Sequence, residues 1–76
     1  MYIISILECE KNKGKMNELG YVKSVSYELN SFAITKNKKY AKKYSTDYEA
    51  QFEIDSLTLM EFQNKKRNLT FSYDVV

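Results

Sequence analysis

Residues 46–57 read TDYEAQFEIDSL, and two incompatible patterns overlap in this stretch. Thr46 and Glu49 have the spacing of a helix capping box, and Asp47 would place a negative charge in the first turn. These signals predict a helix that begins here and runs through Leu57.

The same stretch also alternates strictly between apolar and polar residues, which is the period of an amphipathic strand. The apolar positions are Tyr48, Ala50, Phe52 and Ile54, and the polar positions are Glu49, Gln51, Glu53 and Asp55. The cap and the alternation therefore disagree. We favour the helix, and the strand stays open as the alternative.

The residues before this stretch predict strands. An apolar run rich in β-branched isoleucine over 2–7 predicts a first strand, and the polar residues 10–15 predict a loop after it. Residues 21–29 alternate at period two, which predicts a half-buried strand. Asn30 and Ser31 interrupt this pattern, and residues 32–35 resume it, so we predict a β-hairpin with a tight turn.

The remaining segments complete the predicted fold. Residues 36–44 place Tyr and Ala at helical spacing among lysines, which predicts one or two helical turns. Residues 57–62 and 69–73 resemble strands joined by a polar connection over 63–68, which predicts a C-terminal hairpin. Together the segments predict an α+β fold: a small antiparallel β-sheet with one or two short helices packed on one face, in a single domain spanning residues 1–76.

The composition fits a folded chain without the usual cross-links of small proteins. Hydrophobic residues make up 43% of the 76 residues, which is enough for a packed core. The single cysteine, Cys9, cannot form an internal disulfide, and the chain has no histidine to bind zinc. We expect no cofactor and no metal site. Self-association is the remaining route to added stability, so a homodimer stays open.

Net charge and hydropathy limit the cellular setting. The net charge of +2 is too small to predict a nucleic-acid partner from composition alone. The apolar run over 2–7 is too short to span a membrane, and no cleavage-site pattern follows it. With one unpaired cysteine and no visible export signal, we expect a cytoplasmic location and no membrane association.

The chain carries few residues suited to catalysis. No histidine is present as a base, and Cys9 lies between Glu8 and Glu10, whose charges disfavour a reactive thiolate. Glu49, Glu53 and Asp55 could supply an acid–base pair or hold a hard cation, but we favour a solvated helix face, because no Asp-rich loop with glycine accompanies them. No glycine-rich phosphate loop is present. We therefore predict that the protein is not an enzyme.

A lysine- and tyrosine-rich segment is the candidate binding surface. Lysines can neutralise phosphates while tyrosine rings stack on exposed bases, although the same tyrosines could face the core and leave the lysines as solubilising charges. We favour the second reading, because one arginine is few for nucleic-acid recognition. The residues are Lys36, Lys38, Lys39, Tyr40, Lys42, Lys43 and Tyr44, with Lys65, Lys66 and Arg67 as a second basic group.

The region from Gly20 to Leu57 resembles short proteins encoded by phages and prophages of low-GC Gram-positive bacteria. The resemblance lies in Tyr21, Val22, Lys23, Ile34, Thr35, Ala41, Tyr44, Thr46, Glu49 and Ala50. It implies a β-hairpin followed by a helix and an accessory role directed at the host, and it transfers no catalytic residue. The alternation after Tyr48 departs from the pattern and puts the helix there in doubt.

Two functions follow as expectations. The first is a phage-type protein that acts by protein–protein interaction, binding a host or phage protein and inhibiting a host enzyme or defence system. Its surplus of tyrosine, a favoured interface residue, supports this reading. The second is a nucleic-acid-binding module that uses residues 36–44.

Overall fold

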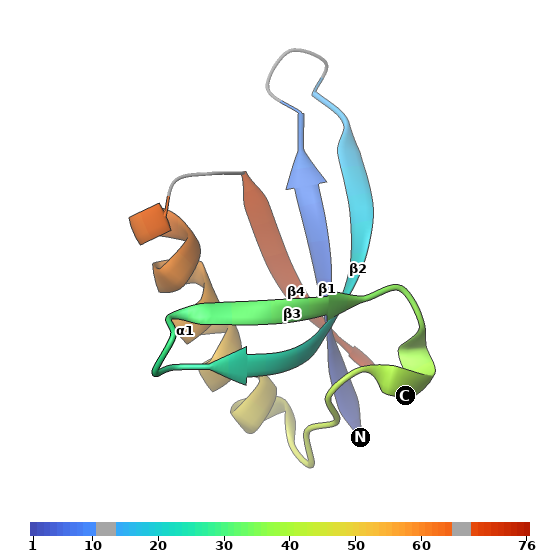
Figure 1. Cartoon of the computed structure of the whole chain (residues 1–76). Helices are drawn as coiled ribbons and strands as arrows, with labels where there is room; N and C mark the ends of the chain where they lie inside the picture. The colour runs from blue at the N-terminus through green and yellow to red at the C-terminus, as the bar shows by residue number, and fades with distance from the viewer. Residues whose placement is uncertain (11–13, 65–67) are drawn as a thin grey trace.

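The computed structural model describes residues 1–10, 14–64 and 68–76 and shows a curled antiparallel sheet with one long helix against it (Figure 1). The strand order is β3-β2-β1-β4, so β1 is central, and β4 pairs with it from Tyr2↔Val75 to Glu8↔Leu69. The elements in chain order are β1 (Tyr2–Cys9), β2 (Met16–Ser26), β3 (Ser31–Thr35), the 3₁₀ turn η1 (Lys38–Tyr40), α1 (Asp47–Asn64) and β4 (Leu69–Val75).

A glycine allows β2 to bend between the part that pairs with β1 and the part that pairs with β3. The register of β1 against β2 shifts between Ile6 and Leu7, beside Gly20. Gly20 has φ +139°, and a Cβ atom there would lie 2.5 Å from the carbonyl oxygen of Thr35. Since other residues rarely adopt this conformation and have no room for a side chain here, glycine permits both the bend and the close approach of β3. The bend curls the sheet around its concave face.

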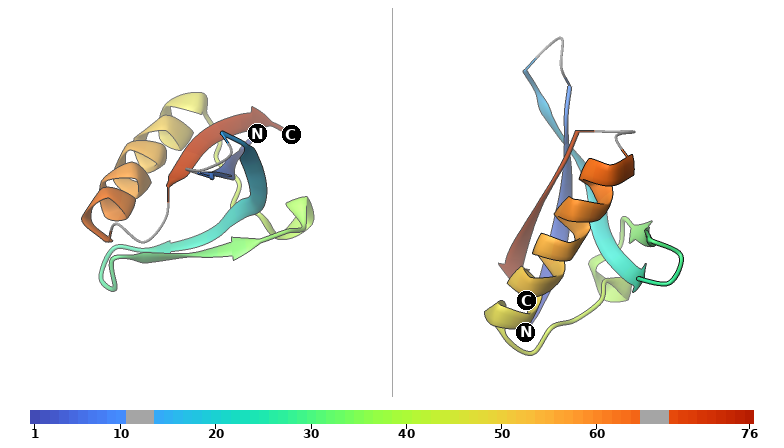
Figure 2. Two further views of the ribbon diagram at one scale, coloured as in Figure 1. Left: turned by 90° about the horizontal axis from the view of Figure 1, so that it is seen from above. Right: turned by 90° about the vertical axis from the view of Figure 1, so that its left-hand side faces the viewer.

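The helix α1 fills the concave side, between β4 and the β2–β3 hairpin (Figure 2). The rings of Phe32 on β3 and Phe71 on β4 meet edge to face with centroids 5.6 Å apart, so the two edge strands of the sheet also touch across the core. The main core consists of Ile4, Ile6, Val22, Tyr44, Ala50, Ile54, Leu57, Met60 and Phe71.

The segment between β3 and α1 is fixed to the end of the sheet by backbone hydrogen bonds. The amide of Lys42 donates to the carbonyl of Val22 over 2.9 Å. Tyr2 and Tyr44 exchange two such bonds, of 2.9 and 2.8 Å. These bonds bring the ring of Tyr44 into the core and lead the chain to the start of α1.

The predicted α+β fold is confirmed, as is the β-hairpin around Asn30. One boundary was wrong, because the strand expected over 21–29 begins at Met16 and ends at Ser26. Residues 27–30 form the turn, in which Asn30 has φ +52° and its amide donates to the carbonyl of Tyr27. The turn predicted between 36 and 44 is present as η1.

The helix predicted from Thr46 is confirmed, and the strand alternative is wrong. The hydroxyl of Thr46 accepts from the amide of Glu49 over 3.1 Å, as the capping box predicts. The C-terminal hairpin is also wrong, because residues 57–62 continue α1 to Asn64. These residues look strand-like because the helix carries apolar residues on two opposite faces, which blurs its 3.6-residue period.

Candidate functional site

A buried carboxylate, Glu53, accepts hydrogen bonds from three side chains. It is 6% exposed on the inner side of α1. It accepts from the hydroxyl of Tyr44 over 2.8 Å, from the ammonium of Lys42 over 2.8 Å, and from the hydroxyl of Tyr27. The Lys42 ammonium also lies 5.2 Å from the centroid of the Tyr44 ring. Glu53 therefore joins α1 to the hairpin turn and to the segment before the helix.

The surroundings of Glu53 keep it ionised. Burial alone would raise its pKa, but the hydrogen bonds from Lys42, Tyr27 and Tyr44 outweigh burial and hold the pKa of Glu53 below its usual range. Burial, followed by the hydrogen bond to Glu53, raises the pKa of Tyr44. A carboxylate whose charge is satisfied by three donors is a poor general base. The arrangement therefore suits a structural role.

The expectation of a solvated carboxylate face is wrong for Glu53 and holds for its neighbours. Glu49 and Asp55 lie on the exposed part of α1, where Asp55 accepts from the side-chain amide of Gln51 over 3.0 Å. Burial of Glu53 was missed because its donors come from distant parts of the chain. Across residues 1–10, 14–64 and 68–76, no three His, Cys, Asp or Glu side chains gather as a metal site would need.

The described residues of the candidate basic surface do not form one exposed surface in the structure. Lys42 is paired with Glu53, and the ammonium of Lys43 donates to the carbonyls of Lys38 and Ala41 over 2.9 and 3.0 Å. Tyr44 is 5% exposed in the core, so its ring cannot stack on a base. The interpretation that Tyr40 and Tyr44 face the core is therefore confirmed for Tyr44. It is wrong for Tyr40, whose side chain is 58% exposed.

The remaining members of that surface are not among the hydrogen-bond donors to Glu53 in the described part of the chain. Lys36, Lys39 and Tyr40 are exposed, while the ammonium of Lys38 lies 5.8 Å from the centroid of the Tyr21 ring. The second basic group, Lys65, Lys66 and Arg67, falls outside the described residues.

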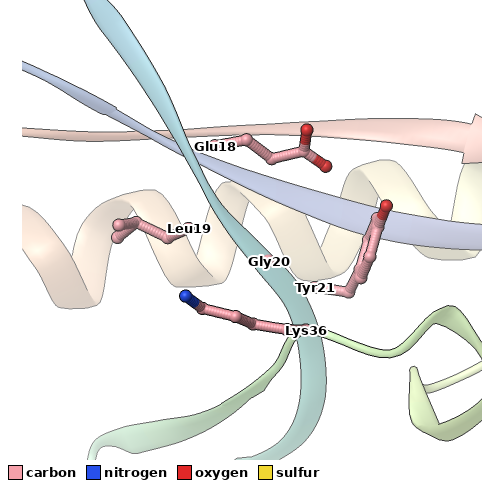
Figure 3. Close-up of a pocket in the computed structure, with 5 residues that line it drawn as sticks. All are labelled: Glu18, Leu19, Gly20, Tyr21 and Lys36. Carbon is pink, nitrogen blue, oxygen red and sulfur yellow. The ribbon is translucent and has the colours of Figure 1, made fainter.

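Lys36 also borders a shallow hollow of about 270 Å³ beside Gly20 (Figure 3). The side chain of Lys36 extends alongside Gly20 toward Leu19, whereas Glu18 and Tyr21 lie beyond Gly20 on its other side. Burial, followed by the nearby Glu18 carboxylate, raises the pKa of Tyr21. One lysine and one glutamate give the hollow mixed charge, and they do not converge on one point. The hollow therefore specifies no ligand chemistry.

A stripe of large apolar side chains on the outward face of α1 is the clearest candidate site. Its exposed fractions are 79% for Tyr48, 67% for Phe52, 58% for Leu59 and 69% for Phe62. These positions follow one another at spacings of four, seven and three residues, which places them on one side of a helix. We call Tyr48, Phe52, Asp55, Leu59 and Phe62 the outward stripe, since Asp55 occupies the gap in the series.

All the charged residues of α1 are acidic. Between Asp47 and Asn64 the helix has five acidic residues and no lysine or arginine, although the whole chain carries +2. One of the five, Glu53, is neutralised internally by Lys42. The outward stripe therefore combines apolar area with negative charge.

Sequence inspection missed the outward stripe, although a signal for it was present. Apolar residues at 48, 52, 59 and 62 have helical spacing of their own, separate from the buried set at 50, 54, 57 and 60. The two sets interleave as an alternation near the start of the helix. Separating them requires knowing that the segment is a helix and which side meets the sheet.

The comparisons with known proteins identify no relative. No family model, curated protein or solved structure matches the chain. The resemblance to phage and prophage proteins therefore stays a prediction. In the described part of the chain, α1 and η1 lack the combination of length and apolarity that crossing a bilayer requires.

Proposed function

We propose that the protein acts by protein–protein interaction and that its partner docks on the outward stripe of α1. The observation that supports this most directly is the exposure of Tyr48, Phe52 and Leu59 along one helix face. Contiguous apolar area on the surface of a small protein is typical of interaction sites. The partner is a host or phage protein, in keeping with the resemblance of residues 20–57 to phage and prophage products, and binding would inhibit a host enzyme or defence system.

The chemistry of the stripe suits binding without catalysis. Aromatic side chains are favoured anchors at interfaces, and burying one large apolar side chain contributes about 1.5–3 kcal/mol. The helix that presents them is held rigidly by its buried inner face, so little ordering cost opposes docking.

The same surface disfavours a nucleic acid. Phosphates are attracted by lysine and arginine, whereas α1 offers acidic residues alone among its charged side chains. The basic segment lacks a free Tyr44 and uses Lys42 and Lys43 internally. Protein binding through α1 is therefore the better-supported function.

Affinity capture from bacterial lysate tests the proposal. The whole protein is immobilised, lysate is applied with and without nuclease, and retained proteins are identified by mass spectrometry. We expect one protein to be retained after nuclease treatment and to be lost with the double variant Phe52→Ser/Leu59→Ser.

The matched control is the double variant Lys39→Ser/Tyr40→Ser, which changes two exposed residues of the basic segment. Circular dichroism establishes that both variants fold. Retention unchanged by Phe52→Ser/Leu59→Ser, but lost with the control variant or with nuclease, would overturn the proposal.

A further inference from the structure

The spacing of the outward stripe gives the shape of its partner. Tyr48, Phe52, Asp55, Leu59 and Phe62 follow one another at intervals of four, three, four and three residues. This is the a/d spacing of a coiled-coil seam, which packs against a second helix by inserting side chains between those of the partner. At 1.5 Å per residue the seam is about 21 Å long, which four turns of a partner helix would cover.

Asp55 indicates which charge the partner helix carries where it meets the seam. It lies in the middle of the seam, and any helix packed there removes its carboxylate from water. A carboxylate in a packed interface is tolerated only when a cation or several donors compensate it. In the part of the chain that the structure describes, the donor to Asp55 is the neutral side-chain amide of Gln51. Since α1 has no lysine or arginine from Asp47 to Asn64, we expect the compensating positive charge to come from the partner.

A second copy of α1 does not meet this requirement. The helix has no lysine or arginine from Asp47 to Asn64. Pairing two copies through this face, in either orientation, would bury two Asp55 carboxylates within about one turn of each other, with no cation from either helix. A self-associated state through α1 is therefore disfavoured by charge.

We infer that the outward stripe binds an amphipathic helix of another protein that carries Lys or Arg in its apolar seam, placed to meet Asp55. This inference rests on the proposed function and adds the structure and charge of the partner. The polar residue in the seam would also fix the register of the two helices, as buried polar residues do in coiled coils.

Synthetic helices test the inference on the whole protein. Three peptides of about four turns share one apolar seam and differ only in its central residue, which is Lys, Gln or Glu. Each is titrated into ¹⁵N-labelled protein and followed by amide chemical shifts. We expect the Lys peptide to bind at least 10-fold more tightly than the Glu peptide, with shifts concentrated in α1. The variant Asp55→Lys should reverse this order.

The outcomes separate the inference from the proposed function. Equal affinity of the protein for the three peptides overturns the requirement for a cation in the partner. The same holds if Asp55→Lys leaves the order of the three affinities unchanged. A dimer of the protein alone that Phe52→Ser disrupts also overturns it. Failure of all three peptides overturns the helical seam. In each case lysate capture that depends on Phe52 and Leu59 still supports docking on α1, whereas capture indifferent to them removes the proposed function itself.

Discussion

Leu57 and Leu59 lie two residues apart on α1 and differ completely in environment. Leu57 is 0% exposed and packs in the core, whereas Leu59 is 58% exposed on the outward stripe. The same contrast separates Ile54 from Phe52 and Glu53 from Asp55. One helix therefore serves two purposes: its inner face closes the curled sheet, and its outer face keeps apolar side chains in water.

This contrast shows that burial and hydrophobicity are separate properties in this chain. The hydrophobic effect explains why the inner residues are buried, but it opposes leaving Tyr48, Phe52 and Leu59 exposed. Scattered exposed apolar residues are ordinary, whereas four on one side of a helix form a surface. Matched substitutions on the two faces of α1 should therefore differ in their effect on the stability of the fold.

The largest difference in unfolding free energy is expected between the variants Leu57→Ala and Leu59→Ala. Truncating buried Leu57 removes apolar contacts and leaves a cavity, which costs about 2–5 kcal/mol of unfolding free energy. The same truncation at Leu59 should change that free energy by less than about 0.5 kcal/mol, as is usual at exposed sites. Urea denaturation of both variants measures the difference. Similar losses from the two would show that the outer face packs within the folded chain.

A smaller difference in unfolding free energy is expected between the variants Glu53→Gln and Asp55→Asn. Replacing Glu53 removes the charge that pairs with Lys42 and disturbs the hydroxyls of Tyr27 and Tyr44. We expect a loss of about 2 kcal/mol, below the range for a fully buried pair because Lys42 is partly exposed. Asp55→Asn should change stability by less than about 0.5 kcal/mol. Equal urea midpoints for Glu53→Gln and the unmodified protein would contradict a structural role for Glu53 and its three donors.

Local signals in the sequence predicted much of the fold. The isoleucine run of β1, the alternation of β2 and the Thr46 cap each act over a few residues, so the sequence alone predicts these elements. The C-terminal hairpin was wrong because residues 57–62 contain Leu, Thr, Met and Phe, which suit a strand or a helix packed on two sides. Tertiary packing against β1 and β4 decides between them.

The candidate site was less predictable because it depends on which residues the fold uses. The lysine and tyrosine segment was conspicuous, yet the fold places Tyr44 in the core and pairs Lys42 with Glu53. The outward stripe was inconspicuous in the sequence, since its apolar residues would ordinarily be expected in the buried core. Local spacing identifies both helix faces but does not say which one meets the sheet.

The smallest predicted effect is a pH dependence that belongs to the inner face alone. The folded-state pKa of Glu53 lies below its usual value of about 4.3, so its ionised form favours the folded state. By linkage, this contribution is fully present above about pH 4.3 and is lost as the pH falls through the folded-state pKa. The unfolding free energies of the unmodified protein and Glu53→Gln should therefore differ at pH 7 and converge toward pH 3. Urea titrations at several pH values measure this convergence. A constant difference across the range would show that the ionised carboxylate of Glu53 is not what joins α1 to Tyr27, Lys42 and Tyr44.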